Sequence, residues 1–339
     1  MKRQKTYLPQ VSACLRTSVF LLASALWLPG CSDNPDQPHP VPTERVPIEL
    51  HATGTDVTSK AETGTTGISR SFGTTVFATT GSGNYTGLTD NGSYKWVKNT
   101  TVQTSGALSL PGNPVYPNDD TDIYLVAVAP QTAVSYDSSN GTVTCTLDGQ
   151  TDLMFAPQIA GNQKDGYRFS GNTSTAADKP LTYAHRLTRL TFKAKKTGTG
   201  TVTVKSLSVK ASPTATLTLA DGNIVFGGTA APMILKPSGD AGKEVSGTGT
   251  TDLGALLLPP LDMGTDSPYK VTVETSDKTY TELPIAFDSN QGRFAAGYSY
   301  EITLNFKTED GETKELEILS VSVAPWTPNE IGGDLTLTE

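Results

Sequence analysis

Two alternating runs near the end of the chain decide the fold: YSYEITLNF at residues 298–306 and LEILSVSVAPW at residues 316–326. In these runs apolar and polar side chains alternate, a period that is typical of half-buried β-strands. The segment EDGE at residues 309–312 separates them and suits a hairpin loop. The sequence therefore predicts a closing β-hairpin and indicates an all-β protein.

Short runs of the same kind recur along the rest of the chain, and almost no window has a helical period. Before residue 161 they lie at residues 46–53 (VPIELHAT), 73–80, 93–97, 123–129, 142–147 and 152–156. After residue 180 they lie at residues 181–195, 201–211, 215–219, 224–226, 254–258, 269–275 and 279–287. The run IYLVAVA at residues 123–129 is nearly all apolar, which predicts a central strand covered on both faces.

The middle of the chain contains the best candidate for a domain boundary. Residues 161–180 are polar and rich in Gly, Ser and Thr, a composition that favours a connecting loop. The length of 339 residues supports two domains. Strands at this density, with turns throughout, predict two successive β-sandwich domains at residues 71–178 and 179–339.

The first thirty residues have the layout of a secretory signal peptide. Lys2, Arg3, Lys5 and Arg16 make the start basic, and residues 19–28 (VFLLASALWL) form a short apolar run. That run is too short to span a bilayer as a mature helix, which needs about 20 residues. We therefore expect residues 1–30 to be removed on export.

The end of this leader resembles a lipobox. In Leu28-Pro29-Gly30-Cys31 a small residue precedes a cysteine whose thiol can be acylated before cleavage. The alternative is an ordinary signal peptide that happens to contain a cysteine. The polar, proline-rich SDNPDQPHPVP after Cys31 suits a flexible tether, so we expect lipidation at Cys31 and a tether with a candidate propeptide strand at residues 31–70. A lipid anchor would hold the precursor at a membrane without a transmembrane helix.

Charge and cysteine content narrow the function classes. The formal charge is −8 for the whole chain and −12 once the four basic residues of the leader are removed, which argues against nucleic acid as a partner. Of the three cysteines, Cys14 lies in the leader and Cys31 would carry lipid, so only Cys145 remains and no intramolecular disulfide is expected. We expect Cys145 to be a small buried residue.

No pattern of a catalytic or cofactor site is recognised, and we expect no enzyme activity and no cofactor. The three histidines are His39, His51 and His185, and none has a Cys, Asp or Glu at metal-ligand spacing. His185 is expected to be a packed or hydrogen-bonded structural residue. The acidic loop from Asn118 to Asp122 could bind Ca²⁺ through oxygens, although such loops are more often merely solvated. Carboxylates that meet only in space could still form a hydrolase site.

Four stretches together resemble the fimbrillin-like proteins of the Bacteroidetes, which are subunits of type V pili. They are LTYAHRLTRLTFKAKK from Leu181, GTVTCTLDGQTDLMFAP from Gly141, the closing hairpin with its terminal Trp326, and the lipobox and tether followed by Arg70-Ser71-Phe72-Gly73. Each motif alone is too degenerate to identify the family, but the four occur in the order that the family has, which argues against a chance match. The resemblance implies two transthyretin-like β-sandwich domains on a lipoprotein precursor at the outer membrane and cell surface.

The resemblance also implies a mechanism of polymerisation by strand exchange. A protease removes the first strand, residues 46–53, and a strand of the next subunit fills the groove by β-augmentation. Arg70 and Ser71 flank the expected cleavage site, with Lys60 and Arg45 as alternatives. The expected donor is the strand that carries Leu316, Ile318, Val321, Val323 and Trp326, or else residues 334–338. At about 25 cal/mol per Å² of apolar area, one strand contributes many kcal/mol.

Three readings of the sequence remain open. The preferred one is a pilus subunit whose partners are other copies of itself or related subunits. The second is a standalone surface adhesin that binds a glycan or a host protein, or an anchor subunit that is not cleaved. The third is a β-sandwich hydrolase. Aromatic residues gathered on one exposed face would favour the adhesin, and converging carboxylates in a cleft would favour the hydrolase.

Overall fold

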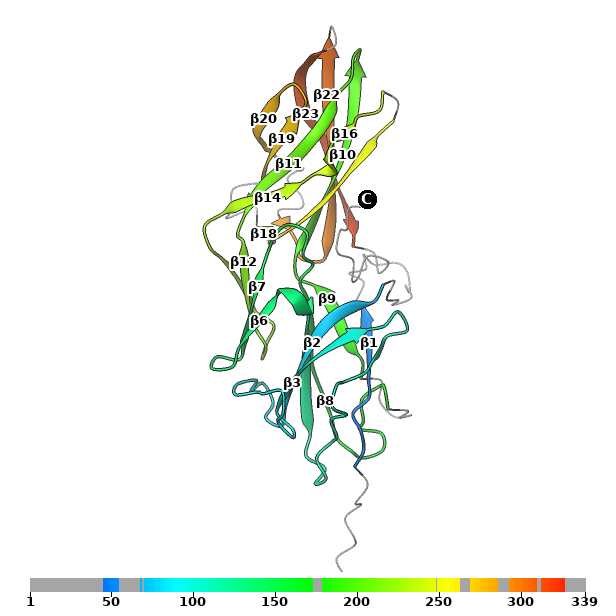
Figure 1. The fold of residues 1–339 in the computed structure, drawn as a ribbon, viewed down its shortest axis with the longest axis vertical. Helices are drawn as coiled ribbons and strands as arrows, with labels where there is room; N and C mark the ends of the chain where they lie inside the picture. The colour runs from blue at the N-terminus through cyan, green and yellow to red at the C-terminus, as the bar shows by residue number, and fades with distance from the viewer. Residues whose placement is uncertain are drawn as a thin grey trace, which may run out of the picture. The chain divides into compact units, whose positions relative to one another are not determined.

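The computed structural model describes residues 45–54, 68, 70–172, 179–247, 249–262, 269–285, 293–309 and 312–326. Their regular elements are β-strands and one 3-10 turn, η1 (Gln131–Ala133) (Figure 1). The prediction of an all-β protein is confirmed. Across these residues no helix has the length and apolar character that a membrane span requires.

Seven strands form a sheet that closes on itself. In order around the ring they are β1 (Leu50–Gly54), β4 (Ala107–Leu108), β3 (Trp96–Val102), β2 (Phe72–Thr79), β5 (Ile123–Ala129), β8 (Met154–Gly161) and β9 (Leu181–His185). Neighbours around the ring run antiparallel except for one pair, β1 and β9, which are parallel with Ala52 opposite Leu181. We call this ring the closed sheet. The sequence predicts a β-sandwich domain at residues 71–178 and gives no sign that this sheet closes on itself.

The interior of the closed sheet is filled by alternate side chains of its strands. Val76 and Ala78 on β2 and Leu125 and Ala127 on β5 point into this first core, together with Trp96 on β3. Side chains two residues apart in a strand share a face, so each strand contributes every second residue. The core members are Ile48, Leu50, Ala52, Ile68, Phe72, Val76, Ala78, Trp96, Val102, Leu108, Leu110, Tyr116, Ile123, Leu125, Ala127, Ala129, Met154, Ala156, Phe169, Leu181 and Tyr183.

Strand β5 is buried on both faces, as its nearly all-apolar sequence predicts. Leu125 and Ala127 face the first core, whereas Val126 and Val128 face a second core outside the closed sheet. Phe77 on the neighbouring β2 faces the same way as Val126, with which it is paired across the strands. The apolar run therefore reflects a strand shared by two cores.

Four further sheets surround the second core. The largest has the order β17 (Thr251–Leu258), β10 (Thr188–Gly198), β22 (Tyr298–Glu309) and β23 (Glu312–Pro325). Another has the order β14 (Ala231–Leu235), β11 (Thr203–Ala211), β19 (Lys270–Thr275) and β20 (Thr279–Pro284), with β16 (Lys243–Glu244) also paired to β11. Strands β18 (Leu261–Asp262) and β21 (Arg293–Phe294) form a pair, and β15 (Pro237–Asp240) completes the region.

The fourth sheet joins parts of the chain that the sequence assigned to different domains. Its order is β13 (Ile224–Gly227), β12 (Thr214–Thr218), β7 (Thr142–Thr146) and β6 (Val134–Asp137) (Figure 1). Cys145 on β7 lies opposite Ala215 on β12. In the other direction, β9 follows residue 179 but pairs with β8 and β1 of the closed sheet. Local alternation predicts these strands correctly but carries no information on which sheet they enter.

The predicted closing hairpin is confirmed. Strands β22 and β23 pair antiparallel from Tyr298 opposite Pro325 to Glu309 opposite Glu312, so residues 310–311 connect them. On its other side β22 runs parallel to β10, with Phe192 opposite Ile302. The inward residues of β10 alternate in the pattern TRLTFKA, where Leu190, Phe192 and Ala194 are buried. The terminal hairpin thus forms one wall of the second core.

Candidate functional site

The candidate removable strand closes the ring. Strand β1 lies between β4, to which it is antiparallel with Leu50 opposite Leu108, and β9, to which it is parallel. Figure 1 shows it as the blue arrow beside β9. Because β1 pairs with a strand on each edge, its removal would open the closed sheet between β4 and β9. We call the place between β4 and β9 that residues 46–54 occupy the seam.

Residues just before β1 already form hydrogen bonds to the segment that follows β4. The backbone N–H of Ile48 donates to the carbonyl of Pro114 at 2.8 Å, and that of Tyr116 donates to the carbonyl of Val46 at 3.0 Å. Further along, the N–H of Ala52 donates to the carbonyl of Gly106 at 2.7 Å. The strand predicted at residues 46–53 is therefore held over nearly all of that length, although its regular part begins only at Leu50.

The inward side chains of the seam contribute to the first core. Ile48, Leu50 and Ala52 are 5%, 3% and 1% exposed, at every second position as the sequence predicts. On the body side the backbone of Gly171 approaches so closely that a Cβ there would lie 2.2 Å from the carbonyl carbon of Glu49. Only glycine fits at that contact, so the body has a surface shaped to the backbone of its first strand.

Arg70 and Ser71 lie between β1 and β2 in the sequence. Both side chains are exposed, and β2 begins at the next residue, Phe72. The neighbours on either side are anchored, because Ile68 and Phe72 are each only 8% exposed. The peptide bond after Arg70 therefore lies in a short exposed stretch between two buried residues. Arg45 is also exposed, just ahead of the seam.

The expected donor residues lie on or directly after β23. Leu316 and Trp326 are buried, and Ile318, Val321 and Val323 are partly buried against the second core. Leu319 on the same strand is 44% exposed. β23 is an edge strand of its sheet, paired only with β22 in the part of the chain that the structure describes. Cys31, Lys60 and residues 334–338 lie outside the described residues.

His185 is a buried, hydrogen-bonded structural residue, as expected. Its Nδ1 lies 3.0 Å from Oδ1 and 2.9 Å from Oδ2 of Asp152, which is itself buried. The imidazole stacks on the indole of Trp326, with the ring centroids 3.7 Å apart and the planes within 4°. Cζ of Arg189 lies 5.9 Å from the same indole. Sequence reasoning missed Asp152 as the partner, because it lies on the loop before β8 and not at a ligand spacing.

The acidic loop does not gather its carboxylates. Hydrogen bonds from Thr121, first from its side chain and then from its backbone N–H at 3.2 Å, lower the pKa of the Asp119 carboxyl. Asp120 pairs with Lys164 at 3.0 Å, and Asp122 accepts from the side chain of Asn162 at 2.8 Å. Among the described residues no group of three or more His, Cys, Asp or Glu could hold a metal ion. Calcium binding at this loop gains no support from the arrangement.

Cys145 is buried and unpaired with any other cysteine of the described chain. Burial, and to a lesser extent the charge of Asp148, raises the pKa of its thiol to about 12. The thiolate is the reactive form of cysteine, so this side chain is inert at neutral pH. Its role as a small packing residue on β7 fits the expectation.

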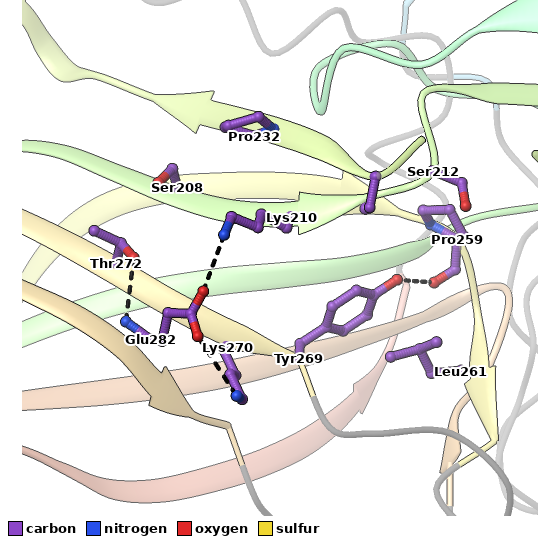
Figure 2. Close-up of a pocket in the computed structure, with 12 residues that line it drawn as sticks. Ser208, Lys210, Ser212, Pro232, Pro259, Leu261, Tyr269, Lys270, Thr272 and Glu282 are labelled. Carbon is purple, nitrogen blue, oxygen red and sulfur yellow. Dashed lines mark hydrogen bonds and ion pairs between the residues drawn. The ribbon is translucent and has the colours of Figure 1, made fainter. Parts of the chain in front are cut away.

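A hollow of about 380 Å³ lies on the sheet that contains β11, β19 and β20 (Figure 2). Glu282 pairs there with Lys210 at 3.0 Å and with Lys270 at 3.5 Å. The hydroxyl of Tyr269 donates to the carbonyl of Pro259, so this aromatic ring is turned inward and is only 5% exposed. Across the described surface Tyr167, at 56%, is the one aromatic side chain that is largely exposed. No aromatic face of the kind expected for a glycan-binding adhesin is seen there.

The fold and the seam define an all-β protein whose closed sheet is completed by its own first strand. The model of the fimbrillin-like family matches residues 52–326. The chain therefore belongs to the fimbrillin-like family, and the resemblance found in the sequence is confirmed.

Two solved structures share this fold. One is a candidate cell adhesion protein from Bacteroides uniformis, 17% identical, with a TM-score of 0.54 over 84% of this chain and 99% of that one. The other is a candidate cell adhesion protein from Bacteroides ovatus, also 17% identical, with a TM-score of 0.51 over the same shares. At this identity the likeness establishes the fold alone. None of the curated proteins matches the sequence.

Proposed function

We propose that this chain is a structural subunit of a surface fimbria, exported as a lipoprotein and polymerised by protease-triggered strand exchange. Its family indicates a fimbrial or adhesion subunit at the cell surface rather than an enzyme. The observation that carries the finer proposal is the position of β1. β1 comes early in the sequence and completes a sheet that would otherwise be open. The exposed Arg70 lies between this strand and the rest of the body.

Loss of β1 after cleavage at Arg70 would leave two strands of the body, β4 and β9, each with one unpaired edge. β4 and β9 would lose their partner, and the positions of Ile48, Leu50 and Ala52 would be empty. Unpaired strand edges and exposed apolar side chains both favour the addition of a new strand. The incoming strand would come from a second copy of this chain or from a related subunit.

Two segments are candidates for the donated strand. The first carries Leu316, Ile318, Val321, Val323 and Trp326, and its transfer would break the ladder between β22 and β23 and withdraw two buried side chains. The second is residues 334–338, which follow this ladder in the sequence. Donation of the second segment would leave the ladder between β22 and β23 and the buried side chains of Leu316 and Trp326 in place.

Lipidation at Cys31 is part of the proposal and has its own test. We expect Cys31→Ser to abolish acylation, because no other residue at the end of the leader offers a thiol. Metabolic labelling with a palmitate analogue, followed by purification of the chain, measures this directly. Cys14→Ser is the matched control and should keep the label in full. Undiminished label in Cys31→Ser would contradict the lipoprotein assignment.

Identifying the first residue of the mature protein on the cell surface tests the proposed cleavage after Arg70. N-terminal sequencing of sheared surface fibres should give Ser71 if the chain is a shaft subunit. A chain that starts at an acylated Cys31 and stays with the membrane would instead be an anchor subunit or a standalone adhesin for a glycan or host protein. The organisation into two transthyretin-like domains also stays a proposal, supported by the two separate cores. A boundary near residue 179 gains no support from them, because β9 after it lies in the closed sheet and β7 before it pairs with β12.

A further inference from the structure

The side chain of Asn172 contacts the backbone of the first strand at two points. Its Nδ2 donates to the carbonyl of Pro47 at 2.8 Å, and its Oδ1 accepts from the N–H of Glu49 at 3.1 Å. Asn172 itself is only 8% exposed. Neither contact involves a side chain of the strand, so the amide binds the backbone alone.

This pair of contacts imitates a neighbouring parallel strand. In a parallel ladder a residue bonds to the carbonyl before, and to the N–H after, the residue that lies opposite it. Asn172 does this with Pro47 and Glu49 around Ile48. β9 supplies such bonds only from Leu181, opposite Ala52. The amide therefore extends the parallel edge of the seam beyond the start of β9.

The orientation of the amide is fixed by its surroundings. The backbone N–H of Glu49 can only donate, so the amide atom that faces it must be the acceptor, Oδ1. The hydroxyl of Tyr116 accepts from the backbone N–H of Phe169 at 2.8 Å and donates to the same Oδ1 at 2.9 Å. Nδ2 is thereby turned toward the carbonyl of Pro47. Tyr116 is fully buried and stacks on Phe169, with ring centroids 5.6 Å apart, which keeps its hydroxyl in position beside Asn172.

We propose that Asn172 is a positioning residue that binds the backbone of whichever strand occupies the seam. This inference rests on the proposed strand exchange for its role after cleavage, when the body keeps Asn172, Tyr116 and Gly171 and the occupant is a strand of a second copy. Because the amide binds backbone only, it accepts different side-chain sequences. It requires a free N–H at the position of Glu49, so a strand with proline there is excluded.

Hydrogen exchange on the full-length chain tests the contact itself. Asn172→Leu keeps the approximate volume and removes both hydrogen bonds. We expect exchange at the Glu49 amide to become about tenfold faster, the effect of losing roughly one net hydrogen bond. The Ile48 amide, which donates to Pro114 on the other edge, is the internal control and should change much less. Asn162→Leu is the matched control variant. Equal acceleration at Glu49 and Ile48 would mean general loosening and would overturn the proposal.

A double-mutant cycle tests the requirement for an N–H. Glu49→Pro should destabilise the wild-type chain in urea unfolding, and this loss should shrink in the Asn172→Leu background, where the N–H has no amide to meet. An equal loss in both backgrounds would overturn the proposal. If the leucine variant does not fold, Asn172→Ala replaces it.

The wild-type chain also offers a test that needs no substitution. The side-chain NH₂ protons of Asn172 should be protected from exchange, and rapid exchange would contradict the contact with Pro47. None of these measurements needs cleavage or polymerisation, so their failure leaves the fimbrial proposal standing.

Discussion

Replacing Arg70 by alanine should abolish the conversion of this chain from a monomer into a polymer. Limited trypsin treatment of the purified wild-type precursor should give a stable product that begins at Ser71. That product should form ladders on SDS gels run without boiling. In Arg70→Ala we expect neither the product nor the ladders, because the remaining chain would keep β1 in the closed sheet.

The structure explains why this site should be cut before the body. Arg70 and Ser71 are exposed, whereas the rest of the described segment from Phe72 to Thr79 is a strand with neighbours on both edges. Proteases bind their substrates as extended segments, so cleavage also needs brief release of Ile68 and Phe72 from the first core. This requirement slows cleavage but does not redirect it, since a paired strand is protected more strongly.

Arg45→Ala is the matched control for this experiment. Arg45 is another exposed arginine, and a cut there leaves β1 attached to the body. Its substitution should therefore change neither the Ser71 product nor the ladders. Lys60→Ala distinguishes the remaining alternative site. If the trimmed chain stays monomeric at high concentration, or if trypsin digests the body generally, the shaft role is wrong and an anchor or adhesin is the better description.

The second large effect concerns Trp326. Trp326→Ala should lower the free energy of unfolding by about 3–5 kcal/mol, the usual cost of truncating a buried tryptophan. The indole is 4% exposed and covers the imidazole of His185, which is paired in turn with Asp152. Its loss leaves a cavity beside a buried polar pair, so the penalty should lie in the upper part of that range. Urea unfolding followed by circular dichroism measures it.

Leu319→Ala is the control for this truncation. Leu319 lies on β23, seven residues before Trp326, but its side chain is 44% exposed. Truncation of an exposed side chain should cost no more than about 0.5 kcal/mol. Equal effects of the two substitutions would show that the end of β23 is not held by the stack on His185. The stability of the second core would then depend on other parts of the strand.

The sequence predicts strands well where alternation is local. The runs at residues 123–129 and 142–147 match β5 and β7 almost residue for residue, and the terminal hairpin was predicted with its turn. The family was also recognised from the order of short motifs. These features depend on neighbours in the chain, and a single sequence contains that information.

Contacts between distant segments could not be predicted in this way. The parallel bond between β1 and β9 joins residues more than a hundred positions apart, and so do the contacts of Asn172 with Pro47 and Glu49. Asn172 lies in a polar, glycine-rich stretch that resembles any connecting loop. A polar residue in such a loop gives no sign that its amide completes a strand edge, since the partner becomes apparent only when the sheet has closed.

The two-edged attachment of β1 also determines how the precursor responds to mechanical force. The expected tether precedes β1 in the sequence, so a pull on a membrane-held precursor would reach the body through this strand, and its component along the strand axis would load the seam. The hydrogen bonds to β4, to Pro114, to Asn172 and to β9 lie across that axis and are loaded in shear. In this geometry the bonds share the load and break together, whereas a strand peeled from one end loses them one at a time. We therefore expect the seam to resist drag at the cell surface far better than it resists a protease that cuts its connecting loop.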